Sequence, residues 1–218
     1  MNNLIKITFF VFLLSCGQDI TYENNIKEDL IFLADDKLEG RKTGTEGEKL
    51  AAKYISERFE KLNLSDKGTE NYYQDFYFGN NNNPHEEIEF NKESDNSQIH
   101  ARNVVGFLDN GGSNTVVIGA HYDHLGYGEE SSLYFGEEVL IHNGADDNAS
   151  GTSLLLDLAN RLATKELKSN YLFIAFSGEE MGLLGSNYFL KNPTVTIDEI
   201  NYMINMDMVG RLNEENKL

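Results

Sequence analysis

Four short apolar runs follow one another in the second half of the chain. They are NVVGFL at 103–108, TVVIGA at 115–120, YLFIAF at 171–176 and YMINM at 202–206. Continuous apolar runs of this length are typical of strands that are buried on both faces of a sheet. We therefore predict four buried strands.

Segments with helical spacing separate the last three of these strands. Residues 150–167 carry apolar side chains at intervals of three and four, with Ser150 or Thr152 available as the N-cap. Residues 182–192 predict a shorter helix that ends before Pro193. Strands that alternate with helices indicate an α/β fold, with a mostly parallel central sheet flanked by helices.

The first half of the chain has weaker signals. Residues 26–33 predict a helix, and Thr45 and Glu48 have the spacing of a capping box at the start of a second amphipathic helix. Residues 72–78 predict a strand, whereas the polar residues 79–87 carry little folding information. Because no interdomain linker is visible, we expect one domain that covers residues 26–218.

The N-terminus has the pattern of an export signal. One lysine precedes an apolar core at residues 7–14, which is too short to span a bilayer and matches a secretory signal. The core ends in Leu-Leu-Ser-Cys, which resembles a bacterial lipobox. We expect residues 1–15 to be a lipoprotein signal peptide, Cys16 to carry lipid, and residues 16–25 to form a tether. The protein would then be exported and membrane-anchored, on the periplasmic or cell-surface side; an isolated buried cysteine is the alternative for Cys16.

Composition narrows the classes of partner. The chain has 218 residues, 40% of them hydrophobic, which is enough for a sizeable core. Its formal net charge of -18 argues against a nucleic-acid partner, because phosphate binding needs a basic surface. Cys16 is the only cysteine, so no disulfide can form within the chain.

Chemically active side chains follow directly after the predicted strands. In an α/β sheet the carboxyl ends of parallel strands share one edge, where ligands bind. The side chains expected at this edge are one histidine and up to six carboxylates: His121, Asp123, Asp146, Asp147, Glu179, Glu180 and Asp207.

So many acids in one crevice require a cation. Two like charges about 4 Å apart cost about 4 kcal/mol at an effective dielectric near 20, and several such pairs would exceed a typical folding stability. Either the groups are protonated or spread apart, or a metal neutralises them. A histidine among carboxylates suits Zn²⁺, with Mn²⁺ or Co²⁺ as alternatives, and does not suit an oxygen-only calcium site.

Four motifs carry a family resemblance. GAHYDHLG, NGADDNASGTSLLLDLA, FIAFSGEEMGLLGS and INMDMVGR resemble, in order and spacing, the motifs of the di-zinc aminopeptidases. LEGRKTGTEGEKLAAKYI is similar to the N-terminal segment of that family, so the resemblance covers about residues 26–211. It implies a zinc-exopeptidase fold and a catalytic domain over residues 26–218, with two zinc ions and a peptide substrate that has a free N-terminus.

The resemblance also implies a role for each matched residue. His121 and Asp207 match ligands of the first zinc, Glu180 matches a ligand of the second, and Asp146 matches the carboxylate that bridges both. Asp147 matches a positioning neighbour, joined to Asp146 by a peptide bond that is cis in relatives. Asp123 matches the acid that fixes the tautomer of His121. Glu179 matches the general base, which takes a proton from water and delivers it to the leaving amine.

The chain departs from the family pattern at its C-terminal end. Relatives have a final histidine ligand after the Asp207 motif, and none follows Asp207 here. We therefore expect one complete metal site, one incomplete site, and a fragment that lacks the C-terminal strands. His124 and His142 could substitute locally, but we expect them to be loop or supporting residues.

The leading hypothesis is a zinc aminopeptidase that hydrolyses the N-terminal peptide bond of its substrate. One alternative is a glutaminyl-cyclase-like zinc enzyme on the same scaffold. Another is a catalytically impaired fragment or a non-catalytic binding homologue. The intact ligands and base favour the first.

Overall fold

The computed structural model describes residues 22–79, 88–91, 98–129 and 132–211. The predicted signal peptide 1–15, Cys16 and most of the predicted tether lie outside the described residues. The first helix, α1 (Tyr22–Leu33), begins earlier than residue 26 and takes up the end of that tether. No helix within the described ranges is both long and apolar enough to cross a membrane.

The centre of the molecule is a seven-stranded sheet, with the strand order β3-β2-β4-β6-β5-β7 and β1 paired to β4. The strands are β1 (Ser65–Asp66), β2 (Tyr73–Gly79), β3 (Phe90–Asn91), β4 (Gln98–Leu108), β5 (Thr115–His121), β6 (Asn170–Phe176) and β7 (Ile200–Asn205). All four predicted apolar runs and the predicted strand at 72–78 are therefore strands. The predicted burial is confirmed for the runs in β4, β5 and β6 and is wrong for β7, which lies at the edge of the sheet and is mostly exposed.

The predicted α/β class is confirmed, but the sheet is mixed and not mostly parallel. Only β6, β5 and β7 run parallel, whereas β4 pairs antiparallel with β6 and with β2. The connection from β4 to β5 is the short turn at residues 109–114. A parallel pair needs a crossover of about a dozen residues or more, so this turn reverses the chain.

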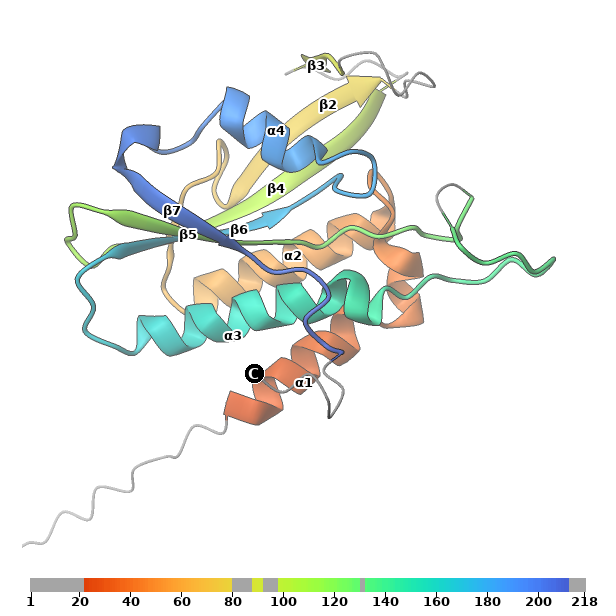
Figure 1. Ribbon diagram of the computed structural model, residues 1–218, viewed down its shortest axis with the longest axis horizontal. Helices are drawn as coiled ribbons and strands as arrows, with labels where there is room; N and C mark the ends of the chain where they lie inside the picture. Colours follow the sequence, from red (N-terminus) through yellow and green to blue (C-terminus); the bar gives the residue numbers. More distant parts are fainter. Residues whose placement is uncertain (1–21, 80–87, 92–97, 130–131, 212–218) are drawn as a thin grey trace, which may run out of the picture.

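Helices cover both faces of the sheet (Figure 1). On one face lie α1, α2 (Glu46–Lys61) and α3 (Gly151–Ala163), and α4 (Leu184–Lys191) lies on the other. The main core joins the sheet to the first group through fully buried side chains: Ile55, Phe59, Val104, Leu155, Leu156 and Phe173. Three layers result, as the alternation of strands and helices predicts.

At the start of α2, one of the two hydrogen bonds of the predicted capping box is present. Thr45 accepts a hydrogen bond from the backbone N–H of Glu48 at 3.4 Å. The Glu48 carboxylate does not return to Thr45; it accepts from the N–H of Gly44 at 2.6 Å and contacts the hydroxyl of Ser177. This glutamate therefore links α2 to the loop that follows β6.

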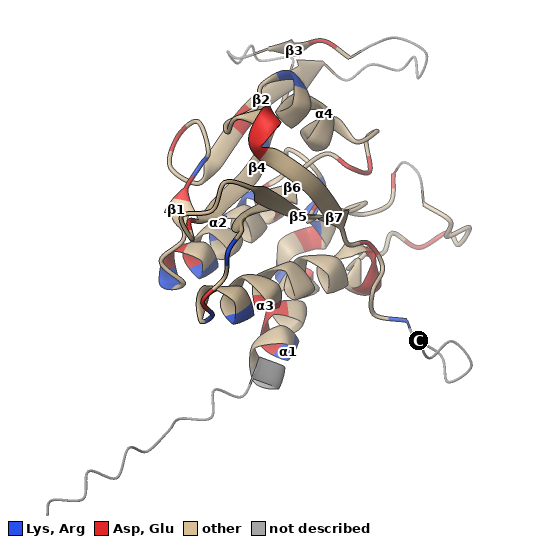
Figure 2. Ribbon diagram, turned by 60° about the vertical axis from the view of Figure 1, so that its left-hand side comes forward, with Lys and Arg blue, Asp and Glu red and all other residues tan. Residues whose placement is uncertain are grey.

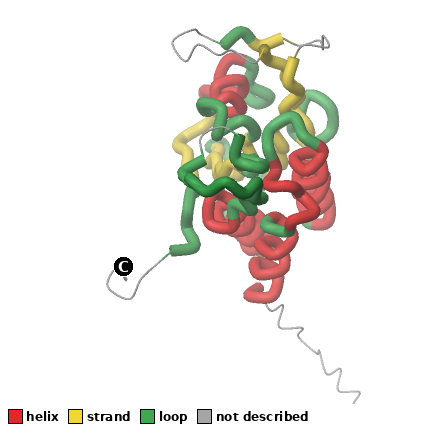
Figure 3. The backbone as a smooth tube through the Cα atoms, turned by 90° about the vertical axis from the view of Figure 1, so that its right-hand side faces the viewer, coloured by secondary structure: helices red, strands yellow, loops and turns green. Residues whose placement is uncertain are grey.

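The three parallel strands point their carboxyl ends at one side of the molecule. Figure 3 views that side, and the loops there face the reader. The loops after β5, β6 and β7 and the turn before α3 all lie there, and the candidate site is built from them.

Candidate metal centre

His121 stands at the centre of the candidate site, at the last position of β5. Its ring is 2% exposed, and its Nε2 lies 3.2 Å from Asp147 Oδ1, 3.5 Å from Asp207 Oδ1 and 3.8 Å from Glu179 Oε2. These acids come from the turn before α3, the segment after β7 and the loop after β6. The structure thus brings together side chains from all four motifs, as the strand ends predict.

Two groups of side chains have the geometry of metal ligands among the described residues. The first donor group is His121, Asp147 and Asp207, and the second donor group is His124, Asp147 and Glu180. Within each group the ligand atoms lie within 4.8 Å of one another. Asp147 belongs to both groups, which is the position of a bridging carboxylate.

The structure therefore gives Asp147 the place that the family resemblance implied for Asp146. The Asp146 carboxylate lies in neither donor group; it accepts from the N–H of Gly210 at 2.9 Å and pairs with Arg211 at 3.1 Å. The cis peptide bond joins Asp147 to Asn148, one bond later than expected. Asp147 has φ −102° and ψ 99° and so departs from helical geometry inside this turn, and the two adjacent aspartates have different partners. Figure 2 shows the acidic turn before α3 beside the end of β7.

Asp123 organises the backbone around both donor groups and is fully buried. Its carboxylate accepts from the N–H of Glu179 at 3.1 Å, from the N–H of Glu180 at 3.3 Å and from the hydroxyl of Thr43 at 3.0 Å. The Nδ1 of His121 lies 3.2 Å from the Asp123 carbonyl oxygen and 3.6 Å from its carboxylate. Asp123 is thus placed to hold the imidazole with Nε2 toward the acids.

The two adjacent glutamates point to different partners. Glu179 faces His121, whereas Glu180 Oε1 lies 2.6 Å from Nδ1 of His124. The second donor group therefore already contains a histidine, one that the sequence analysis expected to be a supporting residue. His142 lies outside both groups, with its Nε2 3.2 Å from the hydroxyl of Ser132.

The buried guanidinium of Arg41 holds the backbone next to the site through hydrogen bonds. The sequence did not predict this role. It is 1% exposed and donates to the carbonyls of Tyr122, Asn143, Gly144 and Leu33. The carbonyl of Leu33 is at the end of α1, and the other three belong to the segment after β5 and to the segment that leads into the turn with Asp147. The sequence signal was Arg41 inside LEGRKTG, but a lone arginine between glycines predicts no burial.

The electrostatics of the site favour a bound cation. Burial alone would lower the pKa of His121, but the nearby carboxylates of Asp123, Asp147 and Glu179 outweigh it and raise that pKa to about 11. Burial, with the charges of Asp123, Glu180 and Asp207, raises the pKa of Glu179 although His121 opposes the shift. The site thus stabilises positive charge at Nε2 of His121.

The donor atoms also fit zinc. Nε2 of His121 is buried with no hydrogen-bond partner, and it faces carboxylates. Zn²⁺ binds histidine nitrogen and carboxylate oxygen, and both donor groups offer one histidine and two acids. A cation between these groups would satisfy the free nitrogen and neutralise the acids.

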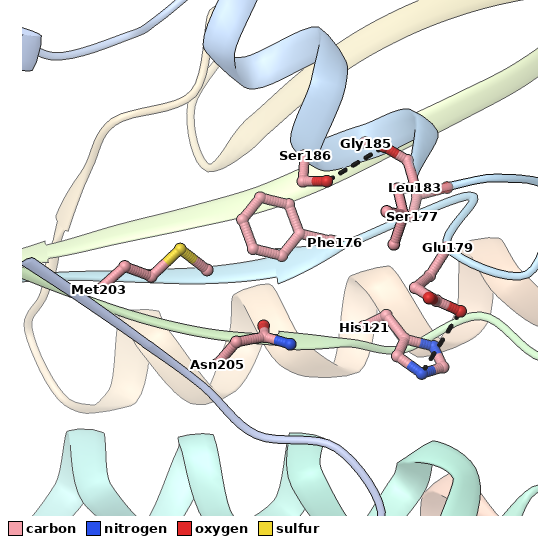
Figure 4. A pocket seen from close by; sticks show the side chains of 9 residues that line it. All are labelled: His121, Phe176, Ser177, Glu179, Leu183, Gly185, Ser186, Met203 and Asn205. Atoms are coloured by element: carbon pink, nitrogen blue, oxygen red, sulfur yellow. Dashed lines mark hydrogen bonds and ion pairs between the residues drawn. The ribbon is translucent and has the colours of Figure 1, made fainter.

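A mainly apolar hollow adjoins the candidate base. Figure 4 shows Glu179 and His121 at one end and Phe176 and Met203 further along. Its volume is about 210 Å³, and Leu183 and Ser186 complete the wall on the α4 side. Its size and lining suit one side chain of a bound molecule.

The fold and the site define an α/β protein with two adjoining metal-type donor groups. The chain belongs to peptidase family M28, whose family model matches residues 103–218, more than half of its length. The family resemblance drawn from the four motifs is thereby confirmed.

Individual relatives agree with this assignment. Aminopeptidase YwaD of Bacillus subtilis is 37% identical over 98 residues, which are 44% of this chain and 18% of that protein. A Zn-dependent exopeptidase from Parabacteroides distasonis has a TM-score of 0.62 at 22% identity, covering 87% of this chain and 61% of that one. A glutaminyl cyclase from Bacteroides thetaiotaomicron has a TM-score of 0.62 at 19% identity, with the same coverage, 87% and 61%. The two structures share the fold, and the matched stretches span less than two thirds of each of these proteins.

Proposed function

We propose that this protein is a zinc-dependent aminopeptidase that removes the N-terminal residue of peptides. The observation that carries the proposal is Asp147, which is shared by two donor groups beside Glu179. Aminopeptidases and zinc metalloproteases among the relatives support the same reading. We further propose two zinc ions, one held by each donor group.

The side chains have separable tasks in this mechanism. Zinc, when bound, acts as a Lewis acid and makes water easier to deprotonate near neutral pH. Glu179 is in reach of His121 but belongs to neither donor group, so its carboxylate is free to accept the proton of the attacking water. It then delivers that proton to the nitrogen of the departing amine. Burial raises the pKa of Glu179, which brings it closer to the value that suits such a proton shuttle.

Two further elements prepare the site and the substrate. Asp123 holds the backbone of Glu179 and Glu180 in place through their N–H groups. The hollow beside Glu179, with Phe176, Leu183 and Met203 in its wall, offers an apolar place for the first side chain of the peptide. We therefore propose a preference for apolar N-terminal residues.

Metal content and peptide cleavage test the proposal together. Purified chain should contain zinc and release the chromophore from leucine p-nitroanilide faster than from the lysine or glutamate compounds. Glu179→Gln should abolish turnover, by about 10²-fold or more, and keep its zinc. If that variant lost its zinc, Glu179 would be a ligand and not the base. If zinc-loaded chain cyclised N-terminal glutamine but cleaved no peptide, the cyclase alternative would replace the aminopeptidase.

The proposed location depends on the sequence alone. We propose that the protein is exported and anchored by lipid on Cys16, outside the described residues. Cys16→Ala should move the expressed protein from the membrane fraction to the soluble fraction. A variant that stayed with the membrane would contradict the anchor.

A further inference from the structure

Three polar side chains of the turn before α3 form hydrogen bonds with the segment that follows β7. They are Asp146, Asn148 and Ser150, which lie within three residues of Asp147 in the sequence, and we call them the clamp. Each of them has a partner within residues 206–211, on either side of Asp207. The clamp therefore connects the two acids of the first donor group, one in each segment.

Asn148 holds the beginning of that segment. Its Nδ2 donates to the carbonyl of Met206 at 2.9 Å, and its Oδ1 accepts from the N–H of Met208 at 3.3 Å. These two residues flank Asp207. The side chain is fully buried, so both hydrogen bonds are shielded from water.

Ser150 and Asp146 hold the rest of it. The Ser150 hydroxyl accepts from the N–H of Val209 at 3.0 Å and donates to the Asp146 carbonyl at 2.6 Å, so it bridges the two segments and does not cap α3. Asp146 Oδ1 accepts from the N–H of Gly210 at 2.9 Å, and Oδ2 pairs with Arg211. Three successive N–H groups thus end on three clamp side chains.

The backbone also shows how closely the turn before α3 and the segment after β7 approach each other. Gly151 lies so near that a Cβ there would sit 2.5 Å from the Met206 carbonyl oxygen. Met208 has a φ of +51°, which a residue with a side chain adopts only when its surroundings hold it there. Both features place residues 206–208 closely against the turn that carries the clamp.

We infer that Asp146, Asn148 and Ser150 are positioning residues, which set Asp207 against His121 and Asp147 and so shape the first donor group. The inference rests on the proposed metal site and extends it. A supporting residue of this kind typically changes metal affinity by about 10- to 100-fold. Asp146 acts through the backbone of residues 206–211 and does not bind metal itself.

Metal affinity tests the inference with matched variants. Asp146→Ala and Asn148→Ala should weaken one of two zinc-binding events about 10- to 100-fold, measured by competition with a chromophoric chelator. Asp146→Asn keeps an oxygen for the N–H of Gly210 and should stay within about threefold of wild type. Asp147→Asn, which changes the shared ligand, should weaken both events.

Asn170→Ala is the control for a merely structural effect. Asn170 ties the turn at Asn110 and Gly112 to the far end of the sheet with the same chemistry, accepting at 2.9 and 3.1 Å and donating at 2.9 Å. This variant should lose stability toward urea and bind zinc as the wild type does. If it lost zinc as Asn148→Ala does, general destabilisation would explain the result and the inference would fall.

Hydrogen exchange in the presence of chelator tests the clamp without metal. The amides of residues 208–210 should exchange about fivefold faster or more in Asn148→Ala and Asp146→Ala than in wild type. Unchanged exchange and unchanged zinc affinity in both variants would overturn the inference. Loss of both zinc events in Asp146→Asn would also overturn it, because Asp146 would then be a ligand. Wild-type chain that bound zinc without cleaving peptides would refute only the peptidase proposal, since the clamp is measured through affinity and exchange.

Discussion

The buried carboxyl group of Glu48 makes stability depend on pH in a way that can be calculated. Glu48 lies in the first turn of α2 and is 2% exposed. Burial, and then the charge of Asp123, raises the pKa of Glu48 to about 8, although hydrogen bonds from Ser177 and Gly44 oppose the shift. The folded protein therefore keeps this proton at neutral pH.

The direction of the effect follows from which state holds the proton. An unfolded glutamate has a pKa of about 4.3, so between there and the folded value the unfolded chain releases a proton that the folded chain retains. Ionisation then favours the unfolded state, and stability falls as pH rises, by at most about 1.4 kcal/mol per unit. Between about pH 5 and about pH 7.5, Glu48 alone should cost about 3 kcal/mol.

Glu48→Gln removes this titration and keeps the shape of the side chain. The amide oxygen can accept from Gly44, and the amide nitrogen can donate to Ser177. The free energy of unfolding of the variant, minus that of wild type, should rise by about 3 kcal/mol from about pH 5 to about pH 7.5. Urea unfolding measures it, with chelator present in both samples because a bound cation would change the pKa of nearby acids.

Glu46→Gln is the matched control, two residues earlier on the same helix. Glu46 is exposed and pairs with Lys49 at 3.4 Å, so its substitution should change stability by about 0.5 kcal/mol or less at either pH. A difference between wild type and Glu48→Gln that stays the same at both pH values would refute the reasoning, because Glu48 would then be ionised in the folded protein.

Three further changes test the core, the support of the site and the metal. Arg41→Met removes the side-chain donor from the carbonyls of Tyr122, Leu33 and Asn143 and should cost about 3 kcal/mol or more in urea unfolding; a smaller loss would mean that water replaces the guanidinium. Leu155→Ala, fully buried, should cost about 2–5 kcal/mol, whereas Leu190→Ala, 68% exposed, should cost less than about 1 kcal/mol. Chelator should lower the thermal midpoint, and added zinc should restore it, by an amount that grows with zinc concentration; a midpoint indifferent to zinc would contradict the site.

The fold was largely predictable because the central strands β5 and β6 are buried on both faces. The β5 run is apolar throughout, and all seven of its residues are buried. The hydrophobic pattern did not predict whether neighbouring strands run parallel or antiparallel. NVVGFL and TVVIGA look alike, but the short turn between them reverses the chain, and β6 separates the two strands in the sheet. Strand order depends on pairing between distant segments, which hydrophobic periodicity does not encode.

The sequence predicted which side chains lie at the shared carboxyl edge of the strands, but not how each of them is oriented there. His121, Glu179, Glu180 and Asp207 meet because parallel strands share a carboxyl edge, a rule that needs no side-chain geometry. His124 was misjudged because it follows the strand in a loop, where spacing gives no orientation. Its place beside Glu180 follows from Asp123, which accepts from the backbone N–H groups of the glutamate loop.

The choice between Asp146 and Asp147 shows what decides a role when two identical residues are adjacent. The hydrogen-bond partners of the side chains decide the outcome here. Asp146, Asn148 and Ser150 offer an acid, an amide and a hydroxyl, which suit backbone N–H and carbonyl groups, and the structure pairs them with residues 206–211. Asp147 instead has its carboxylate within reach of His121 and His124. Asp147 is therefore the acid that both donor groups share, because its neighbours Asp146 and Asn148 are committed to the backbone of residues 206–211.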